Sequence, residues 1–418
     1  MSRRPRSTRP TALLLLAFAS LAVGAAEPSS PVPTDTPPAL QPSLTVTGEF
    51  WASSSGGLTT GSRWNSLADL GDEIDLSRLG APAGASLTAQ LLWIENQHTT
   101  ADFADLTGAA NPVSGLNASD TWRLFNFFYR QSWAGDRFAL KLGQLALDDD
   151  FMGSDYTGLF AHSALGAMPS QVATPHGAAT GGGGAYPIYA VAAPGVHLSA
   201  RFNEMLSLQL GAYHGGPGAD ERSNHGFAWD GGPGQGLVVF YEGAYSFSLA
   251  GKASSLRAGG ALHTGRFDDF AALATDENAA EVRGLHSFYL IQDLVLCTTA
   301  ADHPTLAAFW RAGLSPQQDR SVVHRYADAG LNWFAPLPGR PDDIAGLAVS
   351  YTEYGRHFRR SDTTLAAAET AIEISYRAQL TGSFTLQAIV QRHFNPLPRA
   401  DGRRHPATVL GLRAAWNY

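Results

Sequence analysis

Seven charged residues stand on the polar side of segments in which polar and apolar residues alternate: Arg130, Lys141, Glu242, Arg257, Arg311, Glu373 and Arg377. An arginine guanidinium binds hydroxyls and anions through a planar fork of donors, and a carboxylate accepts hydrogen bonds from hydroxyls. Such side chains facing water could bind polar solutes reversibly, without covalent chemistry. Arginine supplies nearly all the positive charge, because only Lys141 and Lys252 are lysines. A GC-rich genome would produce the same bias.

Enzymatic chemistry finds little support in the sequence. It contains no Gly-x-Ser-x-Gly or His-Glu-x-x-His motif, and neither lysine lies in a phosphate-binding loop. The single cysteine, Cys297, excludes an intramolecular disulfide and a cysteine-rich metal site. A net charge of −8 argues against a general nucleic-acid binder. We therefore expect no enzyme, no cofactor and no nucleic-acid partner, and keep a hydrolase as a minor alternative.

Four acidic residues lie in one long glycine-containing connection: Asp148, Asp149, Asp150 and Asp155. Carboxylate oxygens are the ligands that a hard cation such as calcium prefers. Acids scattered through a loop are more often simply hydrated, so we expect no metal there.

The N-terminus has the order of a secretory signal. Its basic start contains Arg3, Arg4, Arg6 and Arg9, and an apolar run over residues 12–23 follows. Small residues at 24–26 then provide a cleavage site, and the run is too short to span a membrane as a helix. We assign residues 1–26 to a signal peptide and favour ordinary secretion over twin-arginine export.

Residues 27–42 are dense in proline, which predicts an extended spacer before the main domain at 43–418. No later segment approaches the ~18–20 consecutive apolar residues of a membrane helix. The exported chain is therefore either free in the periplasm or medium, or a membrane β-barrel.

Alternation with a period of two residues recurs along the main domain. At the C-terminus it places Leu410, Leu412, Ala414, Trp416 and Tyr418 on one face. Residues 370–380, 384–391 and 345–352 show the same pattern over about ten residues each. A secreted β-sandwich or β-solenoid would also alternate, but charged residues on the second face suit a water-filled lumen better than a dry core.

We count about 15 such segments, with one more plausible between Leu70 and Leu87. Connections alternate between short ones, such as 135–136, 202–203 and 382–383, and long ones at 148–186, 215–236, 267–283 and 395–405. Short turns on one side and long loops on the other are typical of an outer-membrane barrel. The fold class we predict is all-β, a transmembrane antiparallel barrel of about 16 strands. A terminal aromatic, Tyr418, suits recognition by the outer-membrane assembly machinery.

The chain resembles the carbohydrate-selective outer-membrane porins of the OprB family from about Leu44 to Tyr418. The resemblance is densest at residues 123–131 with 138–145, 155–160, 263–268, 326–330 with 337–343, and 369–379 with 395–396 and 409–413. The chain departs from the family by lacking a Trp-Gly-Gly segment before the first strand. It also has Arg130 where family members tend to carry an acid, which bears on the electrostatics of the pore.

The resemblance implies a porin for passive diffusion of small carbohydrates into the periplasm, in the outer membrane of a Gram-negative-type bacterium. Outer-membrane lipid, small sugars and the assembly machinery are the implied partners, with a homotrimer possible. The seven charged residues named above become candidate contacts for sugar hydroxyls in the lumen. A general or ion-favouring porin without a sugar site, and a non-conducting scaffold barrel, stay as alternatives.

A porin needs a constriction and weak binding that permits both arrival and departure of the solute. Residues 148–186 form the longest connection, so they are our candidate for a loop folded into the barrel; an external loop is the alternative. Aromatic residues near strand ends, Trp133, Trp333, Tyr376, Trp416 and Tyr418, favour an interface girdle. Trp51, Trp64 and Trp310 could face either way.

Overall fold

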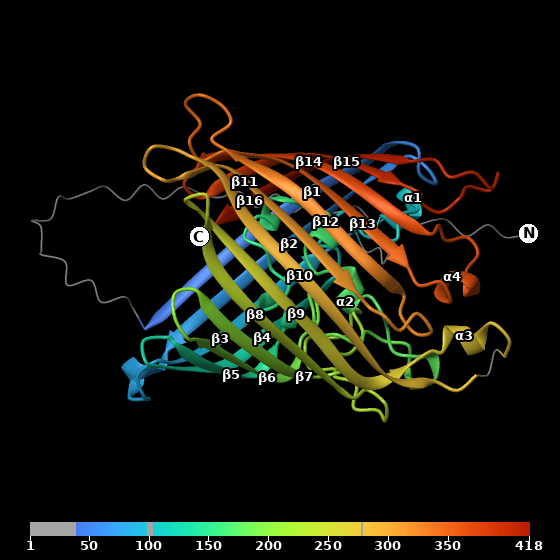
Figure 1. The fold of residues 1–418 in the computed structure, drawn as a ribbon, viewed down its shortest axis with the longest axis horizontal. Coiled ribbons are helices and arrows are strands. Elements are labelled where there is room, and N and C mark those ends of the chain that lie inside the picture. Colours follow the sequence, from blue (N-terminus) through green and yellow to red (C-terminus); the bar gives the residue numbers. More distant parts are fainter. Residues whose placement is uncertain (1–38, 98–102, 277–278) are drawn as a thin grey trace, which may run out of the picture. The chain divides into compact units, whose positions relative to one another are not determined.

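The computed structural model describes residues 39–97, 103–276 and 279–418, which form a closed barrel of sixteen antiparallel strands (Figure 1). Each strand pairs with its neighbours in the chain, and β1 closes the barrel against β16. The predicted all-β barrel of about 16 strands is confirmed. The signal peptide and most of the proline-rich spacer lie outside the described residues.

The strands are β1 (Leu40–Ser55), β2 (Gly61–Asp75), β3 (Ala85–Glu95), β4 (Thr121–Trp133), β5 (Phe138–Leu145), β6 (Ala193–Arg201), β7 (Leu206–His214), β8 (Leu237–Leu249), β9 (Lys252–Phe267), β10 (Val282–Thr298), β11 (Pro304–Leu314), β12 (Val323–Phe334), β13 (Ile344–Tyr354), β14 (Ala368–Thr381), β15 (Phe384–Phe394) and β16 (Ala407–Asn417). Short helices occupy the connections: α1 (Ala104–Thr107), α2 (Pro169–Val172), α3 (Phe270–Leu273) and α4 (Phe358–Ser361). Single 3₁₀ turns are η1 (Leu76–Leu79), η2 (Leu147–Asp149), η3 (Thr157–Leu159), η4 (Ser163–Leu165) and η5 (Ala178–Thr180). In the part of the chain that the structure describes, none of the helices has the length and apolar character to cross a membrane.

The alternation of the sequence corresponds to the two faces of the wall. Ile374 and Leu412 expose 56% and 47% of their surface on the outside, whereas Ile389 and Val409 are buried inside. An outward row of large apolar side chains suits lipid, because lipid solvates them as well as a protein core does. The predicted inside and outside are therefore confirmed for these strands.

Two boundaries differ from the sequence prediction. The sixteenth strand is β2, which ends at Asp75 rather than lying between Leu70 and Leu87. Its outward row includes Ser62, Ser66 and Asp72 beside Trp64 and Leu70, so the apolar alternation is too weak to detect. β1 begins at Leu40, so the last residues assigned to the spacer already pair with β2.

The first strand begins and the last strand ends on the side of the barrel that carries the short turns. Thr45 near the start of β1 pairs with Asn417 at the close of β16. Trp133, Trp333 and Trp416 lie at this same end and are exposed, as an aromatic girdle requires. Trp64 and Trp310 also face outward, whereas Trp51 faces inward and donates its indole N–H to Glu49 at 2.9 Å.

Two long connections fold back into the barrel instead of projecting from it. The inner segment, residues 146–192 between β5 and β6, includes α2, which contacts β10, β11 and β12 (Figure 1). The second is residues 96–120 between β3 and β4, described except for 98–102; its Gly115 N–H donates to the Ala161 carbonyl of the inner segment at 2.8 Å. The predicted inward loop is confirmed, and the second inward connection is an addition that sequence reasoning missed.

Close packing against the wall depends on glycine at two positions. A Cβ atom at Gly346 would lie 2.6 Å from the Leu159 side chain of the inner segment. A Cβ atom at Gly411 would lie 2.3 Å from the Trp51 ring. Only a residue without a side chain admits these approaches, so the inner segment and the Trp51 ring lie directly on the backbone of the wall.

Arginine at Leu412 should destabilise the barrel by ~2–4 kcal/mol, because the side chain would enter the lipid core near mid-membrane. The measurement is the free energy of unfolding in urea, with the protein refolded into lipid vesicles. Trp416→Arg is the control, since this outward position lies at the strand end and should lose only ~0–1 kcal/mol. Equal losses at both positions would contradict the depth assignment.

Candidate functional site

Arg311 on β11 joins the inner segment to the wall. Its guanidinium pairs with Asp328 on β12 at 2.5 Å, and both side chains are fully buried. The remaining donors reach three main-chain carbonyls of the inner segment, those of Met152, Ala164 and Gly166, at 2.7–3.1 Å. A guanidinium has five N–H donors in a planar fork, which makes this multiple attachment possible. Arg311 is therefore an anchor for the segment and has no surface left for a passing solute.

Glu373 on β14 binds main-chain N–H groups of the inner segment, as Arg311 binds its carbonyls. Its carboxylate accepts hydrogen bonds from the main-chain N–H groups of Ala161 and His162 at 2.8 and 2.9 Å. Ser375 and Gln391 donate to the same carboxylate. Two of the seven candidate lumen contacts, Arg311 and Glu373, thus bind backbone rather than facing an open channel.

Further wall side chains hold the two inward connections in the same way. Asp293 accepts from the Asp155 N–H and the Ser154 hydroxyl, and Asn332, Gln387 and Gln391 donate to the carbonyls of Tyr156, Leu159 and Val113. Arg123 on β4 binds the carbonyls of Ala190 and Asn224 and the carboxylate of Asp220. Buried irregular backbone needs such partners, because an unpaired polar group away from water costs ~1–3 kcal/mol.

A polar cavity of about 450 Å³ lies between the first residues of the inner segment and strands β6–β9. It is on the short-turn side of the segment, because its lining includes the β4–β5 turn. Charged residues of both signs line it together with serines: Asp136, Arg137, Asp150, Asp155, Arg201, Glu242 and Arg257. Its lining, within the described residues, contains no aromatic ring. We name it the vestibule cavity.

Four of the seven predicted residues gather around the vestibule cavity. Arg257 lines it and bridges Asp155 at 2.7 Å and Asp293 at 2.6 Å. Glu242 lines it and accepts hydrogen bonds from Tyr289 and Gln209 at 2.8 and 2.9 Å. These two side chains thus belong to the cavity wall and are also tied to their neighbours.

Lys141 and Arg130 contribute to the cavity through their partners. The Lys141 ammonium pairs with Asp150 at 2.6 Å, and Arg130 pairs with Asp136 at 3.0 Å; both carboxylates line the cavity. Lys141 stands directly opposite Arg130 in the β4–β5 register. Opposite charges next to this basic pair reduce its repulsion, since like charges on facing residues destabilise a sheet.

Arg377 lies on β14, the same strand as Glu373, and apart from the four residues around the vestibule cavity. It is half-buried beside Gln387 in the register and makes no ion pair among the described residues. Arg413 of β16 faces the same Gln387 from the other side and pairs with Glu49 at 2.5 Å. The structure thus separates Arg377 from the vestibule cavity on β6–β9.

The four acids near the start of the inner segment do not converge on one point in the described structure. Asp149 accepts a hydrogen bond from Asn126, whereas Asp150 and Asp155 pair with Lys141 and Arg257. Asp148 is buried and accepts the Tyr189 N–H at 3.1 Å. Burial, together with the neighbouring Asp149 carboxylate, raises the pKa of Asp148 from 3.8 to about 7.

Sequence reasoning found the inward charges but missed their partners. Asp293 and Asp328 are the acids on which Arg257 and Arg311 depend, and both follow the alternation of their own strands. Arg201 was missed as well, although it lies on the cavity side of β6. The alternation of each strand predicts that these residues face inward. It does not predict which of them pair, because pairing depends on the register between strands.

The chain is similar to known proteins in sequence family and in fold. A family model described as carbohydrate-selective porin, OprB family, matches residues 65–418. No curated protein matches the chain. The high-pH structure of Pseudomonas putida OprB is 17% identical, with 91% of this chain and 94% of that chain covered and a TM-score of 0.78.

Other solved barrels resemble the chain less closely. The outer-membrane channel DcaP of Acinetobacter baumannii is 10% identical, with 91% and 97% of the two chains covered and a TM-score of 0.51. A mutant of the Rh. blastica porin is also 10% identical, with 91% and 100% covered and a TM-score of 0.51. At these identities the likeness concerns the fold.

Arg311→Met should destabilise the protein by ~3–5 kcal/mol, because Asp328 would stay buried without its cation. Arg311→Met with Asp328→Leu should recover much of this loss but still release the inner segment, since its carbonyls lack donors in both variants. Urea unfolding measures the first effect, and limited proteolysis within residues 150–170 measures the second.

Arg130→Met is the matched control, because its partner Asp136 is exposed and the pair should contribute at most ~1 kcal/mol. Its inner segment should stay as protected as in the wild type. Protection of the segment in the double variant would contradict the anchoring role of Arg311.

Asp148→Asn should stabilise the protein at about pH 8 and have no effect near pH 4. The raised pKa of Asp148 means that the folded state resists ionisation, so stability falls as the pH rises from about 4 to about 7 and then levels off. Urea unfolding across this range measures the difference. Asp150→Asn is the comparison: it should destabilise the protein near neutral pH, because it breaks the pair with Lys141.

Proposed function

The chain belongs to the carbohydrate-selective porins of the OprB family, and from this we propose that small carbohydrates diffuse through its barrel by way of the vestibule cavity. Monosaccharides and short oligosaccharides are the solutes, and the direction is into the periplasm across the outer membrane of a Gram-negative-type bacterium. Family and fold are those of diffusion channels, and the proposal contains no catalytic step.

The composition of the vestibule cavity is the observation that carries the proposal. Its volume, about 450 Å³, falls within the range of sites that enclose small molecules. Guanidinium groups offer donors and carboxylates offer acceptors, and a sugar hydroxyl is both a donor and an acceptor. Most of these charged side chains already have a hydrogen-bond or ion-pair partner in the wall or the inner segment, so a sugar exchanges one set of hydrogen bonds for another. Binding of this kind is weak, as passage through a pore requires.

Arg201 is the side chain we propose to contact the sugar most directly. It lines the vestibule cavity, is exposed, and has no ion-pair partner among the described residues. Its donors are therefore available to a solute without breaking a contact of the wall. Glu242 and Arg257 form the adjoining surface of the cavity. Beside it, Lys141 and Arg130 form ion pairs with the carboxylates of Asp150 and Asp136.

We also propose that residues 1–26 are removed as a signal peptide, after which the C-terminal strand guides assembly. The feature that supports the role of the C-terminal strand is the outward apolar row of β16, from Leu410 through Trp416, which ends next to Tyr418. Association of three barrels stays a prediction of family resemblance, and the mass of the detergent-extracted complex tests it.

Single-channel current across a planar bilayer tests the function, with glucose and maltose titrated onto the purified, refolded protein. We expect stepwise conductance that each sugar reduces saturably. Conductance that is indifferent to sugar would make the protein a general porin. A folded barrel without conductance would support a scaffold and contradict the proposal.

Arg201→Ala should raise the sugar concentration that halves the current by about tenfold, because one charge-assisted hydrogen bond is lost. Arg377→Ala is the matched control: it also removes an inward arginine without an ion pair, but outside the vestibule cavity. Both variants should fold and shift ion selectivity, and only Arg201→Ala should weaken sugar block. The same block in both variants would exclude Arg201 as the sugar contact.

A further inference from the structure

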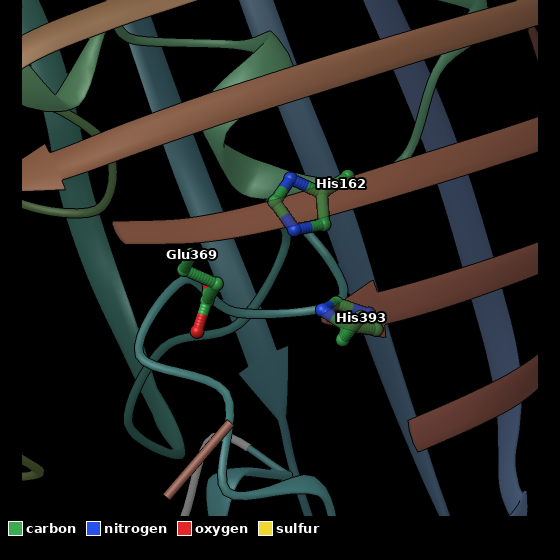
Figure 2. Close-up of side chains that lie close together, drawn as sticks. All are labelled: His162, Glu369 and His393. Atoms are coloured by element: carbon green, nitrogen blue, oxygen red, sulfur yellow. The ribbon is translucent and has the colours of Figure 1, made fainter. Parts of the chain in front are cut away.

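Two histidines and a glutamate meet inside the barrel, away from the vestibule cavity. His162 comes from the inner segment, Glu369 from β14 and His393 from β15 (Figure 2). One nitrogen or oxygen atom of each lies within 4.8 Å of those of the other two, and all three residues are buried. Within residues 39–97, 103–276 and 279–418, no other histidine, cysteine or acidic side chains form such a group of three.

The His162 ring is buried and unpaired. It is 1% exposed, and neither of its ring nitrogens has a hydrogen-bond partner. Buried polar atoms are normally paired, and a ring with both nitrogens unpaired inside a protein is unfavourable. The His393 ring lies 5.2 Å away, centre to centre. Within the described residues, both His162 ring nitrogens are therefore available to a ligand.

The neighbours of His393 fix which of its nitrogens is available. Gln391 donates its amide N–H₂ to Glu373 and to the Val113 carbonyl, so its oxygen is the acceptor that faces His393. The His393 Nε2 atom, 3.0 Å from this oxygen, must then carry the proton. The lone pair is left on Nδ1, which has no partner. In this tautomer the Nδ1 lone pair can bind a metal ion, and the hydrogen bond from Nε2–H to Gln391 keeps the ring in that tautomer.

Glu369 is oriented by the connection between β3 and β4. Its carboxylate accepts the main-chain N–H groups of Ala110 and Asn111 at 2.7 and 3.1 Å, and the Asn111 side-chain amide at 2.8 Å. These bonds fix the direction of the carboxylate, as outer contacts do in metal sites.

We propose that His162, Glu369 and His393 bind a zinc ion. Two imidazole nitrogens and one carboxylate oxygen are a donor set that Zn²⁺ takes at ~2.0–2.2 Å, with a fourth position for water. Donors around such an ion stand ~3.3–3.5 Å apart, which small side-chain rotations reach from the present separations. Calcium and magnesium prefer oxygen ligands, so two histidines favour zinc over them.

Zinc at this position would be a cross-link between the inner segment and the wall. His162 directly follows Ala161, whose N–H is held by Glu373, and the ion would add a second bond from the same turn to β14 and β15. Through Glu369 it would also join the β3–β4 connection. The site therefore acts on the position of the inner segment and not on the solute.

The experiment is zinc analysis of the full chain refolded in detergent, either with ZnCl₂ or with EDTA, followed by desalting. Loading during refolding is chosen because the three residues are buried and access from outside is restricted. We expect one zinc per chain and a higher thermal midpoint than for the EDTA sample. In competition with a chromophoric chelator, His162→Gln and His393→Ala should each lower zinc affinity by at least about 100-fold.

His176→Ala is the matched control. His176 is also buried, belongs to the inner segment and lies beside a second histidine, His263, but both its ring nitrogens contact main-chain carbonyls. This variant should keep one zinc. A zinc-free wild type would overturn the proposal and assign the space to water. Zinc retained in both site variants, or lost equally in His176→Ala, would also overturn it.

Discussion

The structure depends on one requirement: irregular backbone placed inside a membrane barrel must find hydrogen-bond partners there. A strand satisfies its polar groups by pairing with its neighbours, but the inner segment has few regular elements. Its carbonyls and N–H groups instead meet side chains of the wall, and Arg311 and Glu373 are the clearest cases. Non-helical backbone at membrane depth is tolerated only where protein or water surrounds it. The charges of the wall meet this condition.

This requirement changes how the charged lumen is interpreted. Inward arginines and carboxylates suggest a pore lined for its solute, and seven such residues were predicted. Two of them, Arg311 and Glu373, are consumed by the anchoring of the segment, and Arg257 is shared between anchoring and the vestibule cavity. The free donor at the cavity is Arg201, which alternation on β6 also places inward. Charged side chains in this lumen therefore have two uses: some hold the inner segment, and others line the vestibule cavity.

The sequence predicted the barrel well because lipid imposes a simple rule on every second residue. Leu410, Leu412 and Ile374 face outward for that reason. β2 was not recognised in full from the sequence, because serine and aspartate interrupt its outward apolar row. Partners such as Asp293 and Asp328 could not be predicted, since they depend on register and on the path of a loop far away in the chain. The inward path of residues 103–120 had no periodic signal in the sequence.

The anchors bind main chain, and main chain is common to all residues. Arg311, Glu373 and Asn332 hold carbonyls and N–H groups, and these contacts do not depend on which side chains the inner segment carries. A segment of different sequence with the same path would find the same attachments. The wall thus works as a socket of fixed geometry, and the residues that the segment presents to a solute can diverge while the socket is retained. New selectivity can arise in this fold by exchange of an insert, with the barrel left unchanged.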